Sequence, residues 1–125
     1  MDQKAVGNRQ KPAMLVVART GQPLASRVIT ARTWSARVKG LLGRPALPAG
    51  EAMWFPGCRS IHTCGMRFAI DAVFVDRQWR VVAVRERLAP WRLVLPVWGA
   101  WGVVELAEGT LARGGFGVGD ELQLA

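Results

Sequence analysis

The sequence predicts a mainly β protein, an antiparallel β-sandwich or barrel with one short amphipathic helix. Roughly seven or eight short apolar segments, typical of strands, are separated by closely spaced turn signals. Strands do not alternate with helices, which argues against a doubly wound parallel sheet. At 125 residues, 50% of them hydrophobic, the chain is long enough for one domain with its own core.

The first part of the chain divides into a tail and a hairpin. Residues 1–13 are polar and basic, so we expect a disordered tail that cannot bury enough apolar surface to become ordered. The rest, residues 14–125, is expected to form a single β-rich domain. It begins with strands over 14–19 and 26–30, which a turn containing glycine and proline joins into a hairpin.

The amphipathic helix is predicted over residues 33–43. Thr33 is a suitable N-cap residue, and apolar residues follow at i, i+4, i+7 and i+8. Gly43 suits the helix end, and Pro45 prevents continuation. The helix should therefore lie against a sheet with one apolar stripe, formed by Trp34, Val38, Leu41 and Leu42.

The remaining strands follow from short apolar runs. Segments 70–76 and 79–87 alternate in the manner of strands and are joined by a compact turn, so we expect them to pair. Residues 108–110 open a turn and a short helical segment. Further strands are predicted over residues 51–55, 101–107 and 121–124.

The connection over residues 89–100 is unusual because it is apolar, whereas connections are normally polar. It contains Trp91 and Trp98, two of six tryptophans in a chain without tyrosine. If exposed beside Arg92, these rings could stack on sugars or bases or settle at a membrane interface. The alternative is a lid over the core. The other tryptophans occupy core-like positions: Trp34, Trp54, Trp79 and Trp101.

The net charge of +8 belongs to the N-terminal third. Residues 1–44 carry nine basic side chains and one acidic side chain, whereas residues 45–125 carry eight of each. This third could attract nucleic acid or an anionic membrane, or it could be a solvated face. No apolar stretch approaches the roughly 20 residues of a membrane span, and the start does not read as a secretory signal. We expect a cytoplasmic location, unless a leader precedes this sequence.

Residues 60–76 concentrate the unusual side chains, among them the only histidine, His62, and one of the two cysteines, Cys64. Cys58 and Cys64 are too few for a disulfide framework, and free thiols are expected. Zinc accepts the side chains of Cys58, His62 and Cys64, but their spacing is not a usual zinc pattern and no second pair completes a site. We therefore predict no metal and no cofactor.

Two carboxylates interrupt apolar strands. Asp71 lies within Ile-Asp-Ala-Val, and Glu105 within Val-Val-Glu-Leu. A buried carboxylate is costly unless it is paired or hydrogen-bonded. The expected partners are His62, Thr63, Arg67 or backbone N–H groups. These groups form either a polar network that fixes strand register or the lining of a pocket, and the sequence leaves both open.

With these residues placed, the chain resembles the bacterial and archaeal domain-of-unknown-function 192 family. The resemblance extends over residues 28–124 and implies a single, mainly β domain with a jelly-roll-like sandwich and no established activity. The matching segments are Gly40–Arg44, Glu51–Phe55, His62–Asp76, Val103–Leu106, Gly109–Thr110 and Gly119–Asp120.

The function predicted first is a non-enzymatic binding module, expected to be a monomer, for a small polar ligand or a protein partner. The second hypothesis is a hydrolase that uses His62 with Asp71 or Glu105. The third is electrostatic binding of nucleic acid or anionic membrane through residues 1–44. No catalytic residue is assigned. The candidate ligand-binding residues are His62, Thr63, Arg67, Asp71, Trp91, Arg92 and Glu105.

Overall fold

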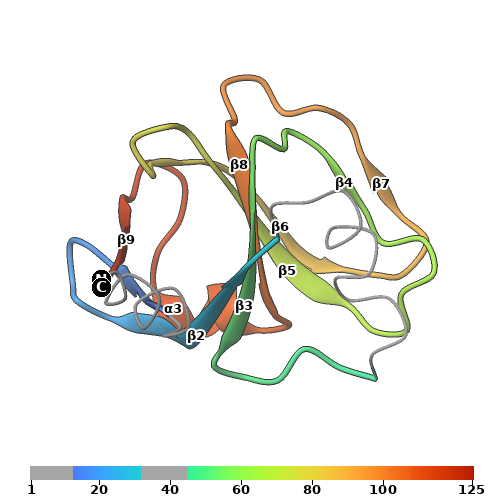
Figure 1. Cartoon of the computed structure of the whole chain (residues 1–125), viewed down its shortest axis with the longest axis horizontal. Coiled ribbons are helices and arrows are strands. Elements are labelled where there is room, and N and C mark those ends of the chain that lie inside the picture. The colour runs from blue at the N-terminus through green and yellow to red at the C-terminus, as the bar shows by residue number, and fades with distance from the viewer. Residues whose placement is uncertain (1–12, 32–44) are drawn as a thin grey trace, which may run out of the picture.

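The computed structural model describes residues 13–31 and 45–125. Within these ranges lie nine strands and one short helix, arranged as Figure 1 shows. The predicted mainly β fold with little helix is confirmed. The elements are β1 (Ala13–Val17), β2 (Pro23–Thr30), β3 (Glu51–Pro56), β4 (Ile61–His62), β5 (Ile70–Val75), β6 (Val81–Leu88), β7 (Leu93–Val94), β8 (Gly102–Ala107), α3 (Thr110–Gly114) and β9 (Leu122–Leu124).

Seven strands form a sheet in the order β6-β5-β8-β3-β2-β1-β9, and this sheet curls into a half-barrel (Figure 1). Its neighbouring strands are antiparallel except β2 and β3, which run parallel and depart from the antiparallel expectation. A parallel pair requires a long crossover connection, and residues 31–50 provide one. The jelly-roll topology stays a prediction.

The strand pairs predicted at the start and in the middle of the chain are confirmed. β1 pairs with β2, and β5 pairs with β6. The turn between β5 and β6 is held by Asp76, whose Oδ1 accepts hydrogen bonds from the N–H groups of Gln78 and Arg80, both at 2.9 Å. The helical segment after residue 108 is confirmed as α3. The predicted helix over 33–43 and residues 1–12 of the predicted tail lie outside the described residues, whereas Ala13, the last residue of that tail, already belongs to β1.

The concave face of the half-barrel carries the larger apolar core. Alternate strand residues point to this face, as the period of two requires. Trp54 on β3 is buried there, and the half-buried rings of Trp79 and Trp101 lie 4.3 and 5.8 Å from its ring centroid. Gly102 on β8 must remain glycine, because a Cβ there would overlap the Trp54 indole. These three tryptophans therefore have the core positions that the sequence predicts.

The convex face is covered by a second, smaller layer. β4 and β7 form a two-stranded antiparallel sheet whose Ile61 and Val94 are paired. Figure 1 shows this layer on the opposite side of β3, β5 and β8 from β9 and α3. Phe74 and Val103 are buried beneath it. In the described part of the chain, no helix is long and apolar enough to cross a membrane.

Candidate functional site

Thr63 joins the central stretch to the apolar connection. Its side chain is fully buried; Oγ1 donates a hydrogen bond to the Ala89 carbonyl at 2.6 Å and accepts one from the Arg92 N–H at 2.9 Å. Its backbone N–H donates to the Arg92 carbonyl at 2.9 Å, and its carbonyl accepts from the Trp91 N–H at 3.1 Å. Because both its backbone and its hydroxyl form hydrogen bonds across this junction, Thr63 fixes the positions of Trp91 and Arg92.

His62 and Arg67 lie at the surface, on either side of Thr63 in sequence. His62 Nδ1 accepts a hydrogen bond from the Cys64 N–H at 3.2 Å, which stabilises the turn that follows β4. Neither His62 nor Arg67 forms an ion pair with a carboxylate of the described residues. Cys58 and Cys64 are not joined by a disulfide. Of residues 13–31 and 45–125, no group of three or more His, Cys, Asp and Glu is placed to hold a metal.

Asp71 lies on the concave face of β5, fully buried and satisfied by three backbone donors. Oδ1 accepts a hydrogen bond from the Arg87 N–H at 2.9 Å. Oδ2 accepts from the N–H groups of Gly109 at 3.1 Å and Leu111 at 2.9 Å, at the start of α3. Asp71 thus ties together three segments that are far apart in sequence.

The bond from Asp71 to Arg87 accompanies a bulge in β6. Ile70 pairs with Leu88 and Ala72 with Arg85, so β6 contains one residue more than β5 between these pairs. Arg87 takes the left-handed conformation, with φ 53°. A bulge bends its strand. This bend sets the direction in which Leu88 and the following connection leave the sheet.

Glu105 lies on the opposite face, under the smaller layer. It pairs with Met53 on one side and Ala72 on the other, both in the convex-face core. Only 5% of its surface is exposed, and its carboxyl has no hydrogen bond or ion pair among the described residues. Burial raises the pKa of the Glu105 carboxyl from 4.5 to about 8. At neutral pH it is therefore a protonated acid within an apolar layer.

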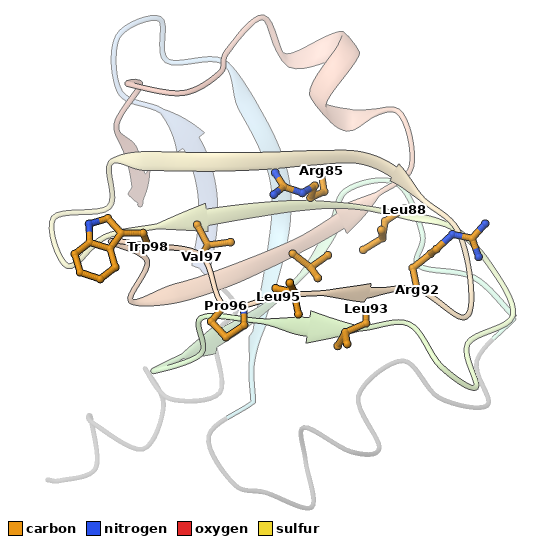
Figure 2. Close-up of a pocket in the computed structure, with 9 residues that line it drawn as sticks. Arg85, Leu88, Arg92, Leu93, Leu95, Pro96, Val97 and Trp98 are labelled. Carbon is orange, nitrogen blue, oxygen red and sulfur yellow. The ribbon is translucent and has the colours of Figure 1, made fainter.

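An open apolar groove runs between β6 and residues 92–98, where the smaller layer ends and the edge of the large sheet continues (Figure 2). Its volume is about 540 Å³. Among the residues that the structure describes, Arg85 on β6 and Arg92 are its two charged lining residues, and no carboxylate lines it. The apolar lining consists of Leu88, Leu93, Val94, Leu95, Pro96, Val97 and Trp98.

Residues 91–98 also expose large apolar side chains, and three of these, Leu93, Leu95 and Trp98, line the groove. Trp98 is 91% exposed, Leu95 71%, and Trp91 and Leu93 each 68%. Figure 2 shows Trp98 and Arg92 at opposite ends of the groove. Val94 in the same segment is buried and anchors it to the convex-face core. The two possibilities left open by the sequence therefore both apply: one residue packs inward, and its neighbours form an apolar surface.

The structure separates the site residues that the sequence suggested. Arg92 lines the groove and Trp91 adjoins it, whereas Thr63 and Asp71 are buried in backbone hydrogen bonds. Glu105 and Asp71 lie on opposite faces of the sheet. Sequence reasoning missed Arg85 and Leu88, because nothing in the strand pattern indicates that β6 is an edge. The apolar character of residues 89–100 was the available signal.

By its fold and its site, the protein is a curled β-sheet protein with an open apolar groove between two arginines. The chain belongs to the domain-of-unknown-function 192 (DUF192) family, described as an uncharacterized ACR, whose sequence pattern matches residues 15–124. A UPF0127 protein of Thermococcus sibiricus is 30% identical over 113 residues, which cover 87% of this chain and 73% of the relative.

Two solved structures share the fold. A Novosphingobium aromaticivorans protein of unknown function has a TM-score of 0.75 and 26% identity, with 90% of this chain and 83% of the other covered. A Sinorhizobium meliloti protein, proposed as a transcription regulator, has a TM-score of 0.76 and 22% identity, with 90% and 91% covered. The second likeness concerns the fold alone. The family is one of unknown function, so a function has to be argued from the site.

Proposed function

We propose that this protein is a non-enzymatic binding module, that its site is the groove between β6 and residues 92–98, and that its ligand is an amphipathic anion. One observation carries the proposal: Arg85 and Arg92 border an apolar groove that no carboxylate of residues 13–31 and 45–125 lines. A ligand with an apolar body and a carboxylate or phosphate group matches both features. This narrows the small polar ligand expected from the sequence.

The hydrogen bonds of the two arginines support this choice. Arg85 Nη1 donates to the carbonyl of Val84 at 2.9 Å, and Arg92 Nη1 donates to the carbonyl of Pro90 at 3.4 Å. Neither guanidinium is paired with an acid of the described residues. Guanidinium groups form strong, often bidentate hydrogen bonds with carboxylates and phosphates. An anionic ligand would therefore supply the charge that the groove lacks.

The arrangement of the candidate catalytic groups favours binding over hydrolysis. Both oxygens of Asp71 are engaged by backbone N–H groups, and Glu105 is buried within the convex-face core. His62 is exposed, and its Nδ1 is bonded to the Cys64 N–H. The hydrolase hypothesis pairs His62 with one of these acids, and neither acid is a hydrogen-bond partner of His62. In this proposal Thr63 and Asp71 position the groove. The proposal also keeps the expectation that the protein is cytoplasmic and monomeric.

The test is a titration of isotope-labelled protein with decyl phosphate below its micelle concentration, followed by amide chemical shifts. We expect the shifts to cluster on residues 84–98. The variant R85Q/R92Q should bind at least about tenfold more weakly, because each guanidinium contributes a charge-assisted hydrogen bond. The matched control R77Q/R113Q removes two arginines that do not line the groove and should bind as the unaltered protein does.

Three results would contradict the proposal. Equally strong binding of uncharged decyl maltoside to the same residues would show that the arginines contribute nothing to recognition. Shifts centred on His62 and Cys64 instead of residues 84–98 would place the site elsewhere. Retained binding in R85Q/R92Q would also show that these two arginines do not recognise the anion.

A further inference from the structure

We infer that residues 91–98 dock this protein onto the surface of an anionic lipid bilayer. The inference rests on the proposed function and names a bilayer as the source of the amphipathic anion. It starts from the concentration of exposed apolar side chains. Of the seven large apolar residues exposed in the described part of the chain, four lie in this segment of eight: Trp91, Leu93, Leu95 and Trp98. A contiguous patch of this kind marks an interaction surface.

The backbone beneath the patch is fixed at both ends. Thr63 holds Trp91 and Arg92 by the hydrogen bonds described above. At the other end, the Val97 N–H donates to the Arg59 carbonyl at 2.8 Å. Between them Leu93 pairs with His62 in the smaller sheet, while buried Val94 points inward. The exposed side chains therefore project from a rigid support and cannot collapse onto the core.

The side chains of the patch match the chemistry of a bilayer interface. Tryptophan favours this region because its ring is apolar and its N–H can still find a polar partner. The indole N–H groups of Trp91 and Trp98 have no hydrogen-bond partner among the described residues. Leu93 and Leu95 supply apolar area between the two rings.

The charges around the patch are mainly positive. Residues 84–99 contain three arginines, Arg85, Arg87 and Arg92, and one acid, Glu86. Basic side chains next to an anionic membrane strengthen attachment by about fivefold each. A long arginine side chain can also keep its guanidinium at the phosphates while its methylene groups lie against acyl chains. The groove and patch thus offer apolar contact and positive charge on one surface.

The same surface is a poor template for an extended peptide. The open edge of β6 carries Arg85, Glu86 and Arg87 together with a bulge, and both features protect edge strands from pairing. β7 is only two residues long, and Pro96 follows shortly after it. A second copy docked through a two-fold axis would oppose the positive surface to itself. Protruding side chains and uncompensated charge favour a lipid surface instead.

Vesicle co-sedimentation tests the inference. The 125-residue chain is mixed with vesicles of phosphatidylcholine alone or of phosphatidylcholine with phosphatidylglycerol. We expect binding to the anionic vesicles. The variant W91S/W98S should lower the partition coefficient by about 100-fold, or about tenfold for each ring removed from the interface. The matched control V118S/L124S removes exposed apolar residues outside the patch and should bind as the unaltered protein does. Unchanged thermal unfolding confirms that both variants are folded.

Each other outcome would overturn the inference in a distinguishable way. If decyl phosphate binds the groove but anionic vesicles do not, docking fails and the proposed function stands. If neither binds, both fail. Equal vesicle binding by W91S/W98S, with loss of binding in salt, would assign attachment to the basic N-terminal third. Sedimentation of a dimer that W91S/W98S dissociates would assign the patch to a second copy. Binding of a poly-glutamate peptide without vesicle binding would assign it to a protein.

Discussion

The two faces of the curled sheet each bury one carboxylate, and their surroundings differ. On the concave face, Asp71 accepts three backbone hydrogen bonds of 2.9 to 3.1 Å. On the convex face, Glu105 has no partner among the described residues, and its pKa is raised to about 8. The concave face is also densely packed around Trp54, whereas the convex face ends in an open groove.

This contrast separates the part of the molecule that provides stability from the part that provides a surface. A satisfied buried carboxylate fixes the segments that bond to it, whereas an unpaired one lowers stability. The groove and the exposed tryptophans lie on the side of the sheet that buries Glu105. Three substitutions test this division, in decreasing order of expected effect.

Replacing Asp71 by alanine should cause the largest loss. The variant D71A leaves the N–H groups of Arg87, Gly109 and Leu111 without their acceptor, so we expect the free energy of unfolding to fall by about 5 kcal/mol. Urea denaturation measures it. The control is D76A. Asp76 accepts two backbone hydrogen bonds in an exposed turn, so its removal should lower the free energy of unfolding by only about 1 kcal/mol. Equal losses would show that burial of Asp71 contributes nothing.

Glu105 should make stability depend on pH. Its pKa is about 8 in the folded protein and about 4.5 when unfolded, so folding takes up a proton between these values. Below pH 4.5 the group is protonated in both states and adds no dependence. From there stability falls as pH rises, by about 4 kcal/mol in total, until pH 8.

The variant E105Q should remove this dependence. Glutamine cannot ionise, so E105Q should match the unaltered protein at low pH and exceed its stability above pH 8. Urea denaturation across the pH range measures both curves. The control E108Q changes an exposed neighbour and should keep the original slope. An unchanged slope in E105Q would mean that Glu105 ionises normally in the folded chain.

The smallest effect is expected at the bulge. Arg87 has a φ of 53°, which glycine adopts without strain, so R87G should raise the free energy of unfolding by about 0.5–1 kcal/mol and retain the N–H bonded to Asp71. R85G is the matched control, since Arg85 has no positive φ, and it should lose about 0.5–1 kcal/mol. Thermal unfolding distinguishes the signs. Destabilisation by R87G would show that the arginine side chain stabilises the bulge.

The sequence predicts the strands of this fold better than it predicts how the site residues meet. Alternating apolar residues locate β5 and β6, and a carboxylate within an apolar run correctly marks Asp71 and Glu105 as buried. Their relative placement depends on a register that the sequence does not contain. Asp71 pairs with Leu106, and Ala72 pairs with Glu105. This offset of one residue places the two acids on opposite faces of the sheet.

The groove could be predicted only in part. The apolar connection signals an unusual surface, but Arg85 becomes a lining residue only because β6 is an edge strand and the smaller layer ends before it. Strand order follows from contacts between distant segments, such as β5 with β8, and no local pattern encodes it.

The hydrogen bonds of Asp71 also bear on how the chain folds. They join residues separated by 16, 38 and 40 positions, so they cannot all form until β6 and the start of α3 have docked on β5. A chain in which only β5 and β6 have paired satisfies Oδ1 and leaves Oδ2 without donors. Because loop closure must precede such distant contacts, the two bonds to Oδ2 are gained only when the start of α3 docks. Asp71 thereby couples the docking of β6 on β5 to the docking of α3.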